Sequence, residues 1–210
     1  MKISNLIKEV TKDYMPLYKE VKRKQKEGIE VTSEELQNLF ELSTKLELFK
    51  ILKSSFMETI VKDENGKVTE YFVKNNLITF HKEIAKDKND NEVEVDVVNE
   101  SMDARIDMLP TEFTQPIIEK MVTAHNKNIE GYKKSGNNEL LNKEQYELEV
   151  LNSFLPKEAT QEDVMGYLNE YYPNGIEKKS MGIVIKEVKN AFDRVDGKMV
   201  AQCVNTKIVS

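Results

Sequence analysis

Residues 156–210 constrain the fold most strongly, because capping residues divide them into three short segments with helical periodicity. Thr160, Ser180 and Asp196 each precede such a segment, and their side-chain oxygens can accept a hydrogen bond from a backbone N–H of the first helical turn. Isolated helices of this length are marginal in water, so the three are expected to share one small core. The residues expected to face that core are Val164, Leu168, Tyr171, Met181, Val184, Ile185, Val188, Phe192, Met199, Val200, Cys203, Val204 and Ile208.

The preceding residues also favour helices. Residues 2–27 have helical periodicity, and Pro16 predicts a kink or break near Met15 because proline cannot donate the backbone hydrogen bond. Thr32 and Glu35 have the spacing of a capping box, and the apolar stripe behind them runs from Leu36 to Ile60. Two more helices are predicted on either side of Gly136, and the short link between them favours antiparallel packing.

Residues 61–99 interrupt this helical pattern. The run 64–67, Glu-Asn-Gly-Lys, lies between alternating segments, and Asn-Gly is a strong signal for a tight β-turn. A second strand pair is predicted from residues 77–80 and 92–97, where valines alternate with acidic residues. Residues 62–107 carry seven basic and twelve acidic side chains, a net charge of −5. Such a segment is either a solvated sheet face or a docking surface for a basic protein partner.

The sequence therefore predicts a mainly α protein with two domains. A helical domain at 1–155 carries inserted antiparallel β-hairpins at about 61–99, and a helical module follows at 156–210. Low glycine and proline, 8 and 5 residues, agree with a helical fold. No apolar run approaches the roughly 20 residues that span a bilayer, and the N-terminus lacks a signal-like segment, so no membrane contact and a cytoplasmic location are expected.

The sequence offers no catalytic or metal-binding constellation. His125 lies on an apolar stripe and is interpreted as a partly buried structural residue, while His81 follows a candidate strand. The loop 87–91 begins like a calcium loop, but Glu92 and Val98 stand where that motif needs glycine and a bidentate glutamate. Cys203, the single cysteine, is expected to pack in the core. We therefore expect no cofactor, no metal and no enzymatic activity. An enzyme would require a deep pocket around His125 with convergent carboxylates.

Charge is unevenly distributed along the chain. The whole protein has a net charge of −6, but residues 178–210 carry seven basic and three acidic side chains, a net charge of +4. A basic end on an acidic molecule fits contact with a phosphate backbone, and it equally fits a solvated helix surface. Nearly all the positive charge is lysine, and Lys- and Asn-rich usage is typical of an AT-rich genome, bacterial or viral.

The C-terminal half of the chain resembles the GatB/YqeY family, which includes YqeY-like proteins and the tail domain of the B subunit of the tRNA-dependent amidotransferase. The resemblance covers about residues 112–210, and the helix at 33–60 is similar to the family's early helices. The segments that carry it are Ile-Glu-Gly-Tyr-Lys-Lys-Ser-Gly at 129–136, 140–144, Glu-Leu-Glu-Val-Leu at 147–151, Leu-Pro at 155–156, Lys-Ser-Met-Gly at 179–182 and Asp-Gly-Lys-Met-Val at 196–200.

The resemblance implies an all-helical fold ending in a three-helix module that is similar to a tRNA-contacting element, and it implies no chemistry. The expected function is that of a non-catalytic RNA-interacting accessory protein, with tRNA as the ligand. The residues expected to contact phosphate are Lys178, Lys179, Lys186, Lys189, Arg194 and Lys198.

The chain also departs from the family pattern. Asn137 and Asn138 stand after Gly136 where the family usually has arginine, and the helix before Gly136 carries few of the family's basic residues. A second hypothesis is therefore a protein-interaction module, or a component of a larger assembly such as a viral or phage one, that uses the acidic insertion at 62–107.

Overall fold

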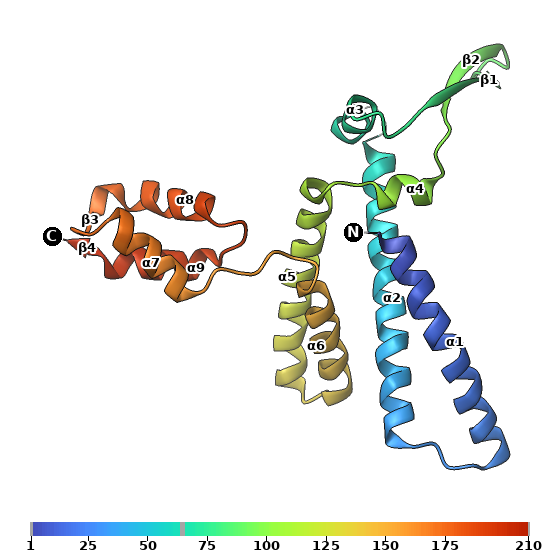
Figure 1. Ribbon diagram of the computed structural model, residues 1–210, viewed down its shortest axis with the longest axis horizontal. Coiled ribbons are helices and arrows are strands. Elements are labelled where there is room, and N and C mark those ends of the chain that lie inside the picture. Colours follow the sequence, from blue (N-terminus) through green and yellow to red (C-terminus); the bar gives the residue numbers. More distant parts are fainter. Residues whose placement is uncertain (1, 64–65, 210) are drawn as a thin grey trace. The chain divides into compact units, whose positions relative to one another are not determined.

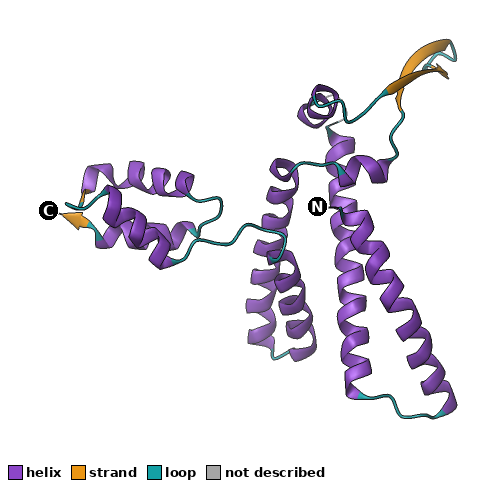
Figure 2. Ribbon diagram, in the orientation of Figure 1, coloured by secondary structure: helices purple, strands orange, loops and turns teal. Residues whose placement is uncertain are grey.

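The computed structural model describes residues 2–63 and 66–209. These residues form nine α-helices, a two-stranded antiparallel hairpin and a pair of very short parallel strands, which confirms the mainly α fold (Figures 1 and 2). The chain divides into two compact units, Met1–Phe154 (unit 1) and Leu155–Ser210 (unit 2). Within the described residues, every helix is too short or too polar to cross a bilayer.

Unit 1 begins with two long helices, α1 (Ile3–Glu27) and α2 (Ser33–Lys62), which pack along each other (Figure 1). Gly28 ends α1 in the left-handed conformation, φ 69°, and donates its N–H to the carbonyl of Lys24. The capping box of α2 is confirmed, because Thr32 Oγ1 accepts the Glu35 N–H at 3.1 Å and the Glu35 carboxylate accepts the Thr32 N–H at 2.9 Å.

The predicted break at Pro16 is wrong, because α1 continues through it as one helix. Proline removes a single backbone hydrogen bond, whereas α1 has about three turns on each side of that position and packs against α2. The packing of a long amphipathic helix therefore outweighs the local preference of one residue.

The core of unit 1 lies where α2 meets α5 (Thr111–Ser135) and α6 (Asn138–Asn152). The helices α5 and α6 are antiparallel, as predicted, and the link between them is closed by Gly136 at φ 71° and by Asn137, whose side chain accepts the Leu140 N–H at 3.1 Å (Figure 1). The apolar stripe predicted on α2 begins further along the helix than Leu36, because that side chain is 47% exposed. The main buried side chains are Leu46, Leu48, Phe49, Leu52, Phe56 and Ile60 from α2, Ile118, Val122 and Ile129 from α5, and Val150 and Leu151 from α6.

The first predicted hairpin is wrong. Its turn residues 64 and 65 lie outside the described residues, but the alternating segment after them forms a helix, α3 (Lys67–Lys74). Val68 and Phe72 are four residues apart, so a helix places both on one face, and each is 1% exposed. The Asp63 carboxylate also accepts the Val68 N–H at 2.5 Å and supports the first turn. The pattern fits both a strand and a helix, and burial against the core selects the helix.

The second predicted strand pair is confirmed in part: its second strand is correct, but its first strand, predicted at 77–80, begins only at Phe80. Strands β1 (Phe80–Lys86) and β2 (Glu92–Val98) pair antiparallel, in register from Phe80 opposite Val98 to Lys86 opposite Glu92. Asp87 closes the loop by accepting the N–H groups of Asn89 and Asn91, an ordinary polar turn. A short helix, α4 (Met102–Asp107), returns the chain to the core.

Unit 2 contains the three predicted helices, α7 (Gln161–Tyr171), α8 (Met181–Ala191) and α9 (Gly197–Thr206). Thr160 and Asp196 cap α7 and α9 as expected. Two short strands that the sequence did not predict, β3 (Ile176–Glu177) and β4 (Ile208–Val209), pair in parallel and close the unit. The buried core consists of Val164, Leu168, Ile176, Val184, Val188, Val200, Cys203 and Val204.

Two details of the predicted module are wrong. Ser180 does not cap α8 with its side chain, because it ends a 3₁₀ turn, η1 (Lys178–Ser180), and its backbone is already helical. Tyr171 does not face the core but is 59% exposed, since it lies in the last turn of α7 and stacks on Tyr167 with ring centroids 4.5 Å apart.

Candidate nucleic-acid interface

Helix α8 is amphipathic in the manner that a phosphate-binding face requires. Val184 and Val188 point into the core of unit 2, and Lys186 and Lys189 are exposed, one turn apart, on the opposite side. Among the described residues, neither lysine has a carboxylate oxygen within 4 Å. Glu187, the acidic residue between them, accepts a hydrogen bond from the Tyr172 hydroxyl, and this bond raises the pKa of Tyr172 to about 12. Both ammonium groups are thus available to an outside anion.

Lys189 extends this face onto α9. A Cβ atom built on Gly197 would lie 2.8 Å from the Lys189 ammonium nitrogen, so the side chain crosses directly over the first residue of α9. Lys198 follows and is exposed. Asp196 Oδ1 accepts the Met199 N–H at 2.7 Å and caps this helix end. The N-terminus of α9 and two lysines therefore come together, and all of them favour an anion.

Lys178 and Lys179 lie in η1, immediately before α8, and both are exposed. Lys179 pairs with Glu177 at 2.8 Å, but its side chain is 82% exposed. Exposed ion pairs of this kind contribute little free energy, so this pair does not prevent Lys179 from contacting another anion. We define the lysine face as the exposed lysines of η1, α8 and α9, namely Lys178, Lys179, Lys186, Lys189 and Lys198.

Arg194, the remaining predicted contact, differs from the lysines. Its side chain is only 16% exposed, and its guanidinium lies 3.6 Å from the Glu158 carboxylate. Its carbonyl oxygen accepts the Ala159 N–H at 2.9 Å. Arg194 thus joins the segment before α7 to the α8–α9 loop, and its position favours a structural role over contact with phosphate.

The lysine face belongs to a unit without net charge. Residues 155–210 carry eight basic and eight acidic side chains, and the acidic ones before residue 178 include Glu162, Asp163 and Glu170 of α7. The positive charge at 178–210 is therefore a local property of η1, α8 and α9. A partner would be attracted by one face of unit 2 rather than by the unit as a whole.

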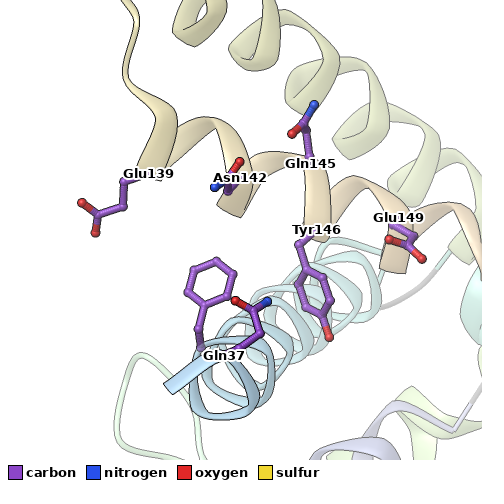
Figure 3. Close-up of a pocket in the computed structure, with 7 residues that line it drawn as sticks. Gln37, Glu139, Asn142, Gln145, Tyr146 and Glu149 are labelled. Atoms are coloured by element: carbon purple, nitrogen blue, oxygen red, sulfur yellow. The ribbon is translucent and has the colours of Figure 1, made fainter. Parts of the chain in front are cut away.

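A hollow of about 420 Å³ lies in unit 1 between α2 and α6 (Figure 3). Its lining combines the Phe40–Tyr146 ring pair with Gln37, Asn142 and Gln145 and the carboxylates of Glu139 and Glu149. None of these lining residues is a histidine, a cysteine, a serine or a cation. The lining therefore lacks a Ser–His or Cys–His pair and a positive charge to attract phosphate.

The described residues form a mainly helical protein whose second unit is a three-helix module with exposed lysines. The family model of YqeY-like proteins matches residues 73–208, and the chain belongs to this family. The match includes the β1–β2 hairpin and unit 2 as far as Ile208, the first residue of β4, but not α1 or α2. The long helix α2, which sequence analysis compared with the family's early helices, thus lies outside the matched range. Comparison with individually curated proteins gives no match.

Proposed function

We propose that this protein is a non-catalytic accessory protein that binds RNA, with tRNA as its ligand, through the lysine face of unit 2. The observation that carries the proposal is the position of Lys189, whose side chain crosses Gly197 at the start of α9, beside the exposed Lys198 and one turn along α8 from the exposed Lys186. Membership of the YqeY-like family supports it, because the related tail domain of the amidotransferase subunit is similar to a tRNA-contacting element.

Lysine determines the kind of binding to expect. Its ammonium group acts as a flexible point charge. It lacks the planar guanidinium with which arginine donates two hydrogen bonds to one base or phosphate. Contacts made by the lysine face would therefore position the phosphate backbone and discriminate poorly between sequences. Binding should be moderate in affinity and strongly weakened by salt.

The test is a binding titration of bulk tRNA at several salt concentrations. The double charge reversal Lys186→Glu with Lys189→Glu should weaken binding and reduce the slope of log K against log salt by about 1.4 to 1.8, since each phosphate contact contributes about 0.7 to 0.9. The matched control reverses Lys8 and Lys12, two exposed lysines of α1 outside the matched range. It changes the net charge equally and should leave the slope unchanged. Absence of binding at about 50 mM salt, or equal effects of both pairs, counts against the proposal.

A second candidate function is protein binding through the β1–β2 hairpin. Most of its residues are exposed, including Ile84 at 73% and Val93 at 37%, and a two-stranded sheet has two unpaired edges that a partner strand can extend. The net charge of −5 over residues 62–107 suits a basic partner. Replacing residues 80–98 by a short glycine linker should then abolish recovery of a partner on co-purification while retaining helicity. Unchanged recovery contradicts this candidate.

A further inference from the structure

Three potential metal ligands meet between α5 and α6 of unit 1. His125 lies on α5, and Glu144 and Glu147 lie one turn apart on the facing side of α6. The His125 Nδ1 atom is 2.5 Å from Glu144 Oε2 and 3.6 Å from Glu147 Oε2. One ligand atom from each residue lies within 4.8 Å of the other two. The carboxylates that sequence analysis did not find for His125 are therefore supplied by α6.

Glu147 is the unusual member of this group. The residue is only 7% exposed, yet among the described residues its carboxylate makes no hydrogen bond, and its contact with His125 is longer than one. Glu144, by contrast, is bonded to His125 and also accepts a hydrogen bond from the Asn128 amide at 3.2 Å. Burial raises the pKa of Glu147. A buried carboxylate without donors is costly unless a cation or a metal compensates its charge.

We propose that His125, Glu144 and Glu147 form a binding site for a divalent first-row transition-metal ion, with Zn²⁺ as the probe. An imidazole nitrogen and two carboxylate oxygens are a ligand set that such ions accept, with water completing the coordination, whereas Mg²⁺ and Ca²⁺ prefer oxygen alone. Facing helices that project one histidine and a Glu-x-x-Glu pair also have the geometry of metal sites in helical bundles.

The charges around the group favour a cation. With a neutral imidazole, the three ligands carry two negative charges, which a divalent ion balances. Lys143, the nearest positive side chain, is paired with Glu47 of α2 at 2.8 Å, and the hydrogen bond from Glu47 raises the pKa of Lys143. Lys143 also lowers the pKa of Glu147 through its charge, but burial outweighs this effect and the pKa of Glu147 stays raised.

Binding requires one local rearrangement. Two ligands of a Zn²⁺ ion, each about 2.0 to 2.2 Å from the metal, lie well over 3 Å apart, so the Glu144 carboxylate must move away from His125 by about 1 Å. The hydrogen bond between them is lost, and the imidazole proton resides on Nε2 when Nδ1 holds the metal. The ion would then connect α5 to α6 in place of the hydrogen bond between His125 and Glu144.

The binding of a metal ion at this site should depend on pH. The groups that face the site are His125 of α5, Lys143, Glu144 and Glu147 of α6, and Glu47 of α2. Because metal ligands must be deprotonated, the affinity of the site for Zn²⁺ should be lower at acidic pH.

The experiment is a calorimetric titration of tag-free, chelator-treated protein with Zn²⁺, supported by the visible absorption of the Co²⁺ form. Wild-type protein should bind one ion, and His125→Asn and Glu147→Gln should each weaken binding at least about tenfold. The matched control is His81→Asn, because His81 is the other histidine of the chain and lies exposed beside Glu83. It should bind as the wild type does.

Circular dichroism of each variant verifies that the fold is retained; Glu147→Gln preserves the shape of the side chain, whereas His125→Asn shortens it. Thermal unfolding provides a second readout: Zn²⁺ should raise the midpoint of the wild type and of His81→Asn but not that of Glu147→Gln. The proposal is overturned if wild-type protein binds no tighter than about 1 mM. It is also overturned if His125→Asn binds normally, which would leave the group as a hydrogen-bonded packing contact.

Discussion

At the scale of single residues, Gly175 shows how one position allows unit 2 to close. Its φ of +90° lies in the region that glycine adopts readily, and an added Cβ would lie 2.3 Å from Val209 Cγ1. The next residue, Ile176, donates its N–H to the Lys207 carbonyl at 2.8 Å, which starts the β3–β4 pair. A glycine is therefore needed where the chain leaves α7 and meets its own C-terminal strand.

We expect Gly175→Ala to destabilise unit 2 by about 1 to 3 kcal/mol, because it imposes both backbone strain and a steric clash. The control is Gly166→Ala in the exposed middle of α7, where an added Cβ meets no atom within 4 Å. That change should stabilise the helix by about 0.5 to 1 kcal/mol. Hydrogen exchange of the amides of α7 and α9 measures both effects, and equal protection in the two variants would contradict the prediction.

At the scale of elements, α2 and α7 each begin at a capping box that pairs a threonine with a carboxylate three residues later. The hydrogen bond from Lys24 and that from the Thr32 N–H lower the pKa of Glu35 at the start of α2. The Thr160 N–H likewise lowers the pKa of Asp163 at the start of α7. A carboxylate with a lowered pKa stabilises the folded state above its ordinary pKa, and this contribution disappears as the pH falls through the folded-state value.

The stability of the wild-type protein should therefore decline below about pH 4.5, the ordinary value for a glutamate. Glu35→Gln should show a smaller decline, because glutamine retains a capping oxygen and does not titrate. Urea unfolding at pH 7 and at pH 3.5 to 4 measures the difference. Glu34→Gln, at a neighbouring exposed position with no capping bond among the described residues, provides the control. An identical pH dependence for Glu35→Gln and Glu34→Gln would show that the capping box does not carry the effect.

At the scale of the whole molecule, the two units have separate cores. The core cluster of unit 2 has eight buried residues, which come from α7, α8, α9 and β3. Such a core is small, and domains of this size are often marginal in stability. The lysine face belongs to this unit, whereas the His125 cluster and the hairpin belong to unit 1.

We expect a fragment of residues 155–210 to fold by itself, with helical circular dichroism and a cooperative thermal transition. Val188→Ala should abolish that transition or lower its midpoint strongly, since removing buried methyl groups costs about 1 to 3 kcal/mol in a domain with little stability to lose. Ile183→Ala, at a position of the same helix that is 63% exposed, should change the midpoint little. A fragment without a cooperative transition contradicts the prediction.

The sequence alone determined the features that depend on neighbours a few residues apart. The caps at Thr32, Thr160 and Asp196, the left-handed end at Gly136 and the apolar periods of the three final helices were all readable, because their hydrogen bonds and spacing are local. The lysines of 178–198 could also be identified from the sequence, since charge needs no knowledge of packing.

Only the tertiary structure decided which distant groups meet. The alternation around Val68 and Phe72 became a helix because both side chains could be buried on one face, a choice that depends on the core and not on the segment. Arg194 lies beside Glu158, and β3 pairs with β4. His125 of α5 lies next to Glu144 and Glu147 of α6. Each of these contacts joins residues that are far apart along the chain, so it depends on packing geometry, which local periodicity does not encode.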